Sequence, residues 1–488
     1  MNAPDQSLFD PADWESFRAL AHTMVDEMID HLQGTRKRPV WQSPSAQARQ
    51  ALGQPVPRAG RDLNTVYDDF KRHILPYPVG NTHPRFWGWV IGTGTPAGVL
   101  AELLTGAMNT PVSGYDQAAT LVEHQVLAWL SELLGMPADS TGVLVSGGTV
   151  ANLIGLTIAR DRAAGKDVRT QGVDPARHGN LAVYGSTMTH SWADRSCDWL
   201  GLGANWLRKA PVDEKHRVKV DELARMIHED RARGVRPACI IGTAGTVSCG
   251  ATDDLNALAD LAAAEGIWFH VDGAFGALAK LSTTYQAVCN GMERADSIAF
   301  DLHKWGYMQY EVGVVLVRDG KAHAEAFAYS SSYLDRFRGG PAVNPIEFSE
   351  RGLQLSRSFR ALKVWMNMSH YGTDLIGAAI EKNINDVQYL KTRIAREPRL
   401  QQVGPADMNV ICFRYIVEGM SQDKLDALNT ELLVRIQESG VAVPSNARID
   451  GRFAIRVANT NHRTTQADFD VLIDAVLATG AALEIESR

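Results

Sequence analysis

The chain contains two apolar runs that decide its fold, each leading into polar residues: Ile267-Trp-Phe-His-Val-Asp-Gly-Ala-Phe-Gly276 and Ser297-Ile-Ala-Phe-Asp-Leu-His-Lys-Trp305. Short apolar runs bounded by polar and glycine residues are typical of buried strands in a parallel sheet. Ligands of such sheets bind at the carboxyl ends of the strands. We therefore expect Asp272, which ends one strand, and the pair His303-Lys304, which follows the other, to face one crevice.

A carboxylate and a lysine that face one crevice are what a pyridoxal phosphate site needs. The lysine forms a Schiff base with the cofactor aldehyde, and the acid keeps the pyridine nitrogen protonated. The apolar neighbours Phe300 and Trp305 favour the neutral amine that this reaction requires at Lys304. Taken alone, a lysine after a strand is usually a solvated charge, and Asp272 could simply cap a turn. Ala274 is small enough to lie against one face of the cofactor ring.

Two other features could complete such a site. Ser146-Gly-Gly-Thr149 lies between a predicted strand and a predicted helix, where Gly147, Gly148 and Thr149 could cradle a phosphate. His190 follows another strand and could stack on the cofactor ring, although a lone histidine is often structural. His303 could contact the phosphate or position the substrate. A second glycine pattern, at residues 92–98, lacks the GxGxxG spacing and so argues against nicotinamide binding.

Strands and helices alternate on both sides of this stretch. Further apolar runs at 142–145, 181–184, 238–243 and 313–317 are separated by segments of helical period. This alternation predicts an α/β fold with a mostly parallel sheet and helices on both faces. We predict three parts: a helical N-terminal dimerisation segment (1–85), a large cofactor-binding α/β domain (86–371) and a small α+β domain (372–488).

The first predicted helix, which begins at Asp10-Pro11, has an apolar face without an evident partner. The face carries residues at three- and four-residue steps: Trp14, Phe17, Ala21, Met24, Met28 and Leu32. The proline-rich stretch at 34–60 that follows predicts an irregular connector. The apolar face must therefore pack either on a second subunit or on later helices of its own chain.

Composition excludes several classes of protein. The net charge is −7 with both signs interspersed, which gives no electrostatic case for binding nucleic acid or a membrane surface. No apolar run approaches the roughly 20 residues of a membrane-spanning helix, and the start of the sequence does not resemble a signal peptide. The five cysteines are scattered and form no CxxC. We expect a cytoplasmic protein without disulfides or structural zinc.

Together these motifs resemble those of the pyridoxal-phosphate-dependent group II amino-acid decarboxylases, which include aromatic L-amino-acid decarboxylase and glutamate decarboxylase. The similar stretches run in the family's order from about residue 60 to residue 370: His83-Pro-Arg-Phe86, Ser146-Gly-Gly-Thr-Val-Ala-Asn152, Thr189-His-Ser191, Gly242-Thr-Ala-Gly-Thr246, His270-Val-Asp-Gly-Ala274, Asp301-Leu-His-Lys-Trp305 and Phe359-Arg-Ala-Leu-Lys-Val-Trp365. The His-Lys-Trp sequence is the most specific of them.

The resemblance implies a fold-type I enzyme with a mostly parallel seven-stranded sheet. It also implies an obligate homodimer with active sites at the subunit interface, in which the N-terminal helices wrap the partner. By position, Lys304 would be the Schiff-base lysine, Asp272 would pair with the pyridine nitrogen and His190 would stack on the ring. The other residues implied in cofactor binding are Ala274 against the ring, Thr246 near its substituents, and Gly147, Gly148, Thr149, Asp301 and His303 around the phosphate.

Tyr333 bears on the type of reaction. It lies in the aperiodic segment 328–346, where similar decarboxylases carry a tyrosine that reaches across the dimer. A phenol there could protonate the carbanion that remains after CO2 leaves and so give an amine. Similar enzymes that make an aldehyde typically carry phenylalanine. A tyrosine exposed on a surface loop is the simpler alternative.

Substrate choice is less sharply indicated. The resemblance places the side-chain pocket near Phe86, Trp87, Trp89 and Tyr115, which would suit an aromatic amino acid. It places Arg357 where an arginine can bind the substrate carboxylate, although Arg360 three residues later makes a helix-surface role possible. However, the segment 109–116 looks closer to glutamate-type enzymes, and Asp301 replaces a residue that is often asparagine in the aromatic group.

We therefore predict decarboxylation of an aromatic L-amino acid (tyrosine, DOPA, tryptophan or phenylalanine) to the amine and CO2. An acidic or other amino acid, or decarboxylation that yields an aldehyde, remains the alternative on the same fold. A catalytically silent relative is disfavoured because Lys304, Asp272 and His190 are all present.

Overall fold

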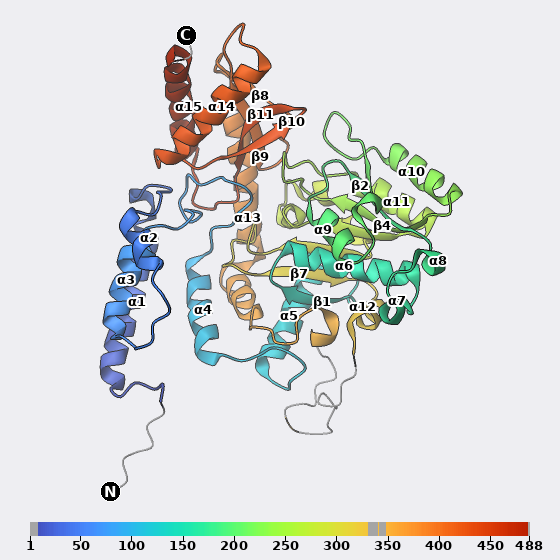
Figure 1. Cartoon of the computed structure of the whole chain (residues 1–488), viewed down its shortest axis with the longest axis horizontal. Coiled ribbons are helices and arrows are strands. Elements are labelled where there is room, and N and C mark those ends of the chain that lie inside the picture. The colour runs from blue at the N-terminus through green and yellow to red at the C-terminus, as the bar shows by residue number, and fades with distance from the viewer. Residues whose placement is uncertain (1–7, 330–339, 341–347, 487–488) are drawn as a thin grey trace.

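The computed structural model describes residues 8–329, 340 and 348–486, and a seven-stranded sheet forms its centre (Figure 1). The strands lie in the order β1-β7-β6-β5-β4-β2-β3. All pairs are parallel except those of β7, which runs antiparallel to β1 and to β6. The predicted α/β class with a mostly parallel sheet is confirmed. The strands are β1 (Thr141–Val145), β2 (Leu181–Ser186), β3 (Leu207–Ala210), β4 (Arg236–Thr243), β5 (Trp268–Asp272), β6 (Ser297–Asp301) and β7 (Gly313–Val317).

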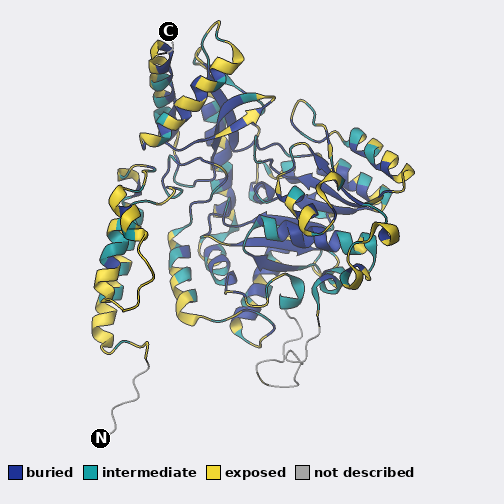
Figure 2. Ribbon diagram, in the orientation of Figure 1, coloured by how far each residue is buried: buried dark blue, intermediate teal, exposed yellow. Residues whose placement is uncertain are grey.

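The central strands are covered on both faces, which explains their unbroken apolar sequences. Every residue of β5, β6 and β7 is buried, so the side chains that point to either face meet a covering layer (Figure 2). The large α/β region contains the helices α5 (Ala118–Leu133), α6 (Gly148–Ala164), α7 (Val168–Gln171), α8 (Pro175–His178), α9 (Trp192–Trp199), α10 (Val220–Ala232), α11 (Leu255–Glu265) and α12 (Gly320–Phe327). Of these, α6 crosses the centre of the sheet and packs on β4, β6 and β7.

A smaller sheet forms the C-terminal part of the molecule. Its four antiparallel strands lie in the order β10-β11-β9-β8, and α14 and α15 pack beside them. Val443, shortly before the first strand of this sheet in space, makes only an isolated bridge to Phe86. The elements are β8 (Leu400–Gln402), β9 (Val410–Tyr415), α14 (Gln422–Glu438), β10 (Ser445–Ile449), β11 (Arg452–Ala458) and α15 (Gln466–Glu486).

The helix α13 (Ala361–Ala395) joins the two sheets. It is kinked at Gly372, whose φ of 72° lies in the left-handed region that favours glycine. The predicted boundary between residues 371 and 372 falls at this kink, although the division of the chain into domains stays a prediction. α13 packs against α4 and α5 at one end and against α15 at the other.

Three N-terminal helices form an arm along one side of the molecule (Figure 1): α1 (Trp14–Gln33), α2 (Ala46–Leu52) and α3 (Leu63–His73). α1 begins after Asp13, whose side chain caps the helix, and not at the predicted Asp10-Pro11. Glu27 of α1 binds Tyr67 and Lys71 of α3. At the far end of the arm, Arg36 forms an ion pair of 2.9 Å with Asp468.

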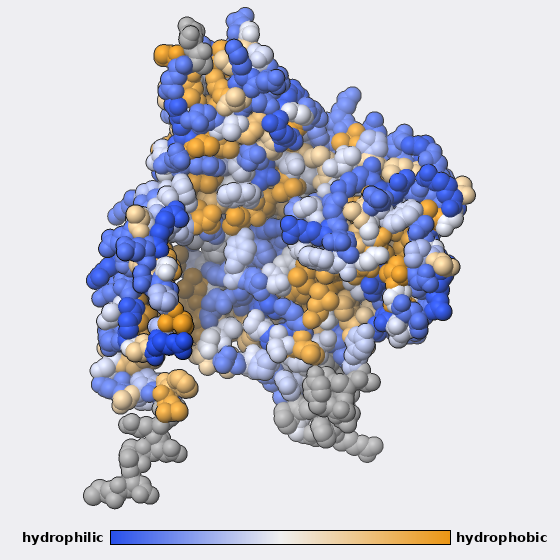
Figure 3. Space-filling model, in the orientation of Figure 1, coloured by the Kyte–Doolittle hydropathy of each residue, from blue (hydrophilic) through white to orange (hydrophobic). Residues whose placement is uncertain are grey.

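The apolar face of α1 is not covered by the described part of the chain. No residue of α1 is buried, and Trp14 and Phe17 are 58% and 42% exposed. The neighbouring helix α4 (Pro96–Met108), which packs on α13, also exposes Leu100, Leu103 and Met108. Figure 3 shows hydrophobic residues gathered along the hollow between the arm and the rest of the molecule. Among the described helices, none has both the length and the apolar character needed to cross a membrane.

Candidate active site

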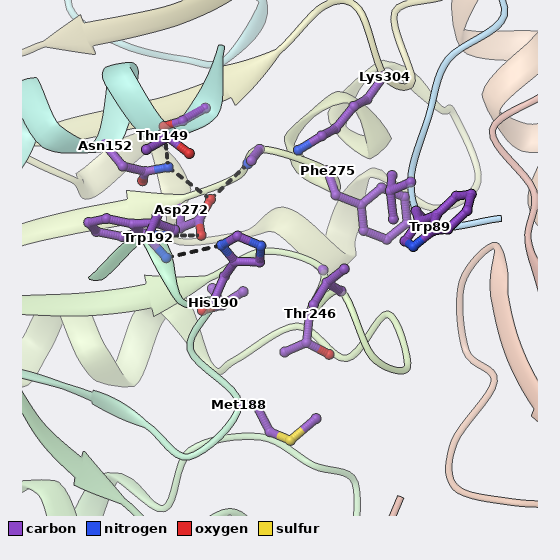
Figure 4. A pocket seen from close by; sticks show the side chains of 16 residues that line it. Trp89, Thr149, Asn152, Met188, His190, Trp192, Thr246, Asp272, Phe275 and Lys304 are labelled. Atoms are coloured by element: carbon purple, nitrogen blue, oxygen red, sulfur yellow. Dashed lines mark hydrogen bonds between the residues drawn. The ribbon is translucent and has the colours of Figure 1, made fainter. Parts of the chain in front are cut away.

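The carboxyl ends of β5 and β6 open into a cavity of about 250 Å³ (Figure 4). β5 ends at Asp272, and Lys304 follows the end of its parallel neighbour β6 by three residues. Asp272, His190 and Lys304 point into the same space, whereas His303, which the sequence analysis expected in one crevice with Asp272 and Lys304, lines a neighbouring cavity. The full lining is Trp89, Val90, Gly148, Thr149, Asn152, Met188, His190, Trp192, Thr243, Gly245, Thr246, Val247, Asp272, Ala274, Phe275 and Lys304.

Asp272 is a buried carboxylate that faces only hydrogen-bond donors. The indole nitrogen of Trp192 donates to Oδ2 at 2.6 Å. The backbone N–H of Ala274 donates to Oδ1 at 3.0 Å, and the amide of Asn152 lies 3.4 Å from the same oxygen. Donors of this kind favour the ionised form of a buried carboxyl group. Asp272 is therefore suited to hold a proton on a ring nitrogen.

Lys304 forms an ion pair with Asp301 in a confined setting. Its Nζ lies 2.7 Å from Oδ2 of Asp301, which is 2% exposed. The second carboxylate oxygen of Asp301 is buried and has no hydrogen-bond partner within the described parts of the chain. His303 lies 3.8 Å from Oδ2 of Asp301, and its Nδ1 accepts from the backbone N–H of Val312 at 3.2 Å. Burial lowers the pKa of His303, so the neutral ring is favoured with its Nε2–H toward Asp301.

The turn from β1 into α6 provides an anion site beside Lys304. Gly148 and Thr149 begin α6, where backbone N–H groups and the helix dipole favour negative charge. A side chain at Gly148 would not fit, because its Cβ would lie 2.8 Å from Asp301 and 3.1 Å from Ala274. A neighbouring cavity of about 340 Å³ shares Gly148, Thr149 and Lys304 and is also lined by Gly147, Asp301 and His303. The helix N-terminus thus packs closely against Asp301 and Ala274, and the second cavity lies beside it.

His190 presents its ring to the cavity in a defined orientation. Its Nδ1 accepts a hydrogen bond from the backbone N–H of Trp192 at 3.2 Å, so the neutral ring carries its proton on Nε2. Burial lowers the pKa of His190, and the charge of Asp272 opposes that shift. A neutral imidazole whose ring is accessible from the cavity is suited to pack against a flat ring.

Three polar lining residues were given no role by the sequence analysis. Trp192 and Asn152 both donate toward Asp272, from α9 and α6. The hydroxyl of Thr243 is buried at the end of β4 and has no partner among the described residues. The one usable signal was a polar asparagine within the apolar run Ala151-Asn-Leu-Ile154 of a predicted helix.

Two predicted substrate-pocket residues lie elsewhere. Trp87 is fully buried in the core of the C-terminal part, where its ring stacks on Phe469 at 4.8 Å and its Nε1 donates to Thr464. Arg357 is buried in an ion pair with Glu123 and also donates to the carbonyl of Leu144 at 2.8 Å. These contacts correct both predictions, because neither side chain reaches the cavity.

The remaining predicted residues divide into three groups. Ala274, Thr246 and Trp89 line the cavity together with the residues described above. Tyr115 is 42% exposed in the segment between α4 and α5 and does not line the cavity of this chain. Its role in the substrate pocket stays a prediction. Tyr333 lies outside the described residues.

The residues of the cavity fit pyridoxal phosphate. The neighbouring cavity and the N–H groups at the start of α6 suit its phosphate, Asp272 suits its ring nitrogen and Lys304 suits its aldehyde. Asp301 is the exception, because its carboxylate stands next to the anion site. No other cofactor is needed to explain why these groups converge on the cavity.

Comparisons with known proteins agree in family and fold. Residues 45–416 match the model of the pyridoxal-dependent decarboxylase conserved domain. An aromatic-L-amino-acid decarboxylase of Bacillus atrophaeus is 33% identical over 455 residues, which cover 92% of each protein. A phenylacetaldehyde synthase of Arabidopsis thaliana is 28% identical over 464 residues, again 92% of each. The solved tryptophan decarboxylase of Catharanthus roseus with L-tryptophan has a TM-score of 0.86 at 25% identity, covering 97% of this chain and 100% of that one.

Proposed function

The chain belongs to the pyridoxal-dependent decarboxylase family, and we propose that it converts an aromatic L-amino acid to the corresponding amine and CO2. It is a carbon–carbon lyase that uses pyridoxal phosphate. The substrate class rests on the wall of the cavity, where Trp89 and Phe275 present aromatic rings. Among the described residues that line the cavity, Lys304 is the sole lysine or arginine, so no second cation is available to pair with an acidic side chain. This composition favours aromatic over acidic substrates.

The cofactor would be held by residues that already converge on the cavity. When bound, pyridoxal phosphate supplies an electron sink for the charge left on the α-carbon as CO2 departs. We assign the aldehyde to Lys304, the ring nitrogen to Asp272 and the two faces of the ring to His190 and Ala274. The phosphate is assigned to Gly147, Gly148 and Thr149, with Asp301 and His303 beside it, and Thr246 to the ring substituents.

The chain's own groups would control charge and water at this site. Asp272, with its three donors, keeps a proton on the ring nitrogen. The apolar side chains of Trp89, Val90 and Phe275 reduce the access of water to the reacting carbon. We assign the proton that converts the decarboxylated substrate to an amine to Tyr333, on the strength of its place in the sequence alone.

We further propose that the enzyme works as a homodimer, with the apolar faces of α1 and α4 against the second copy. The exposed side chains that support this are Trp14, Phe17, Leu100, Leu103, Leu104 and Met108. Exposed apolar surface of this extent usually marks an interaction site. The five cysteines are buried free thiols, which supports the predicted cytoplasmic location.

A screen of the common L-amino acids for CO2 release tests the function. We expect turnover of tyrosine, DOPA, tryptophan or phenylalanine, and amine as the product. Pyridoxal phosphate should give the protein a visible absorbance band, and borohydride reduction should remove the band and add mass at Lys304. A colourless protein after incubation with the cofactor, or release of CO2 from glutamate alone, would overturn the proposal.

One relative indicates an aldehyde as a second product to measure. The similarity to a phenylacetaldehyde synthase favours measurement of aldehyde and ammonia beside the amine. Aldehyde in place of amine would move the enzyme to that alternative without changing the assignment of the cofactor residues.

A further inference from the structure

A row of buried polar side chains runs from the middle of the large sheet to Asp272. The indole nitrogen of Trp268 donates to the hydroxyl of Ser297 at 2.8 Å. The same hydroxyl lies 2.7 Å from Nδ1 of His270, and Nε2 of His270 lies 2.7 Å from the amide oxygen of Asn152. Asn152 in turn donates to the carbonyl of Gly148 at 2.7 Å and lies 3.4 Å from Asp272. Ser297, His270 and Asn152 are each fully buried.

The groups at the two ends of this row give every hydrogen bond one direction. The carbonyl of Gly148 and the carboxylate of Asp272 can only accept, so Asn152 turns its NH2 toward both and its oxygen toward His270. His270 must then donate from Nε2. Burial lowers the pKa of His270 to about 4, so the ring is neutral and its Nδ1 accepts from Ser297. Ser297 accepts in turn from Trp268, whose indole can only donate.

A glycine in α6 leaves space for the ring of His270. Gly155 lies in the middle of this helix, where glycine is less favourable than alanine. A Cβ at Gly155 would lie 2.6 Å from Cε1 and Nδ1 of His270 and 3.0 Å from the hydroxyl of Ser297. The helix therefore gives up stability at the one point where a side chain would displace the row. The ring of Trp192, which donates to Asp272, packs edge-on against His270 at 5.7 Å.

We propose that Trp268, Ser297, His270 and Asn152 form a one-way hydrogen-bond relay, in which His270 fixes the amide of Asn152 so that Asp272 faces only donors. This inference rests on the proposed function, because Asp272 is assigned there to the ring nitrogen of the cofactor. His270 is a positioning residue that acts through Asn152 and does not contact the cofactor. Without its Nε2–H, the buried oxygen of Asn152 would lose its partner, so the amide would be held less firmly and its donor to Asp272 would be weakened. The carboxylate would then hold the ring proton less firmly.

The test replaces His270 by a side chain that keeps the donor and by one that lacks it. In His270→Gln, an amide NH2 can take the place of Nε2–H; His270→Leu has no donor. Each holoenzyme is loaded with pyridoxal phosphate isotopically labelled at the ring nitrogen, whose protonation is then measured by NMR, and the cofactor dissociation constant is measured by titration of the cofactor-free protein. We expect a protonated ring nitrogen in the wild type and His270→Gln. We expect loss of ring protonation and roughly tenfold weaker binding in His270→Leu, the scale of one hydrogen bond to a charged group.

If His270→Leu does not fold, two serine variants provide the test. Ser297→Ala removes the donor to His270 and should shift both measurements in the same direction by a smaller factor. Ser196→Ala is the matched control, because Ser196 is an equally buried serine whose hydroxyl has no partner among the described residues. The relay is wrong if His270→Leu retains a protonated ring nitrogen and wild-type affinity, or if the two serine variants behave alike. Failure of the wild type to bind the cofactor would overturn the proposed function and the relay together.

Discussion

The cavity and the N-terminal arm differ in whether their side chains find partners within this chain. In the cavity, Asp272 and Asn152 are buried polar groups whose partners all belong to this chain. In the arm, Trp14 and Phe17 are apolar groups that remain exposed. Buried polar groups cost free energy unless they are paired, whereas exposed apolar groups gain free energy when they are covered. We infer that the groups around Asp272 are held in place by one chain and that the cover of the arm comes from a second.

The largest effect should come from the lysine at the centre of the cavity. Lys304→Ala removes the amine that would hold the cofactor, and the rate of amine formation should fall by a factor on the order of 10⁴ or more. The visible band should be lost with it, while the protein stays folded. Lys166→Ala, at an exposed lysine that pairs with Glu325, is the control and should leave the rate unchanged. Full activity of Lys304→Ala would place the chemistry elsewhere.

A substitution at Arg357 distinguishes a structural role of this side chain from a role in substrate binding. Its pairing partner Glu123 is fully buried, so Arg357→Met leaves an uncompensated charge and should lower the free energy of unfolding by roughly 3–5 kcal/mol. Urea denaturation at fixed protein concentration measures this loss. Adding Glu123→Leu should recover most of it, because the pair is then replaced by apolar side chains. A raised KM for the amino acid with unchanged stability would restore the substrate-binding role.

Charges placed on the arm test whether its apolar face is covered by a second copy of the chain. Trp14→Asp combined with Phe17→Asp places charges on the exposed apolar face of α1 and should weaken the proposed dimer by roughly a hundredfold. Light scattering across a dilution series measures the dissociation, and activity should fall in parallel. Arg18→Ala, at an exposed arginine of the same helix, is the control. An unchanged dimer would mean that the partner covers a different face, and a monomeric wild type would remove the second copy from the mechanism.

The strands of the site could be predicted because the sheet buries both of their faces. β5 and β6 are buried throughout and mostly apolar, apart from His270, Ser297 and the aspartates that end the two strands, so their runs stand out. β3 was missed because Leu207-Arg-Lys-Ala210 lies at the sheet edge with its two central residues partly exposed, which leaves no apolar run. Gly372 was expected to end a helix, but its positive φ only kinks α13, and the helix resumes on the far side.

Within the site, strand ends were easier to predict than partners on other elements. Asp272 and Lys304 follow apolar runs and could be placed from local sequence. The pairing of Arg357 joins residues 234 positions apart, which no local pattern reports. The aromatic cluster near Trp87 gave no sign of which ring faces the core, and there Trp89 lines the cavity while Trp87 does not. Long-range packing decided each of these cases.

The smallest expected effect concerns the one group that opposes cofactor binding. Asp301 places a buried carboxylate within reach of Lys304 and beside the anion site of α6, where it competes with a phosphate. Asp301→Asn removes that charge and keeps the shape, so the affinity for pyridoxal phosphate should rise by roughly three- to tenfold. Pyridoxal, which lacks the phosphate, is the matched control ligand and should bind the two proteins alike. A gain for both ligands would trace the effect to Lys304 freed from its ion pair, and weaker binding of pyridoxal phosphate would show that the Asp301 carboxylate supports the cofactor site.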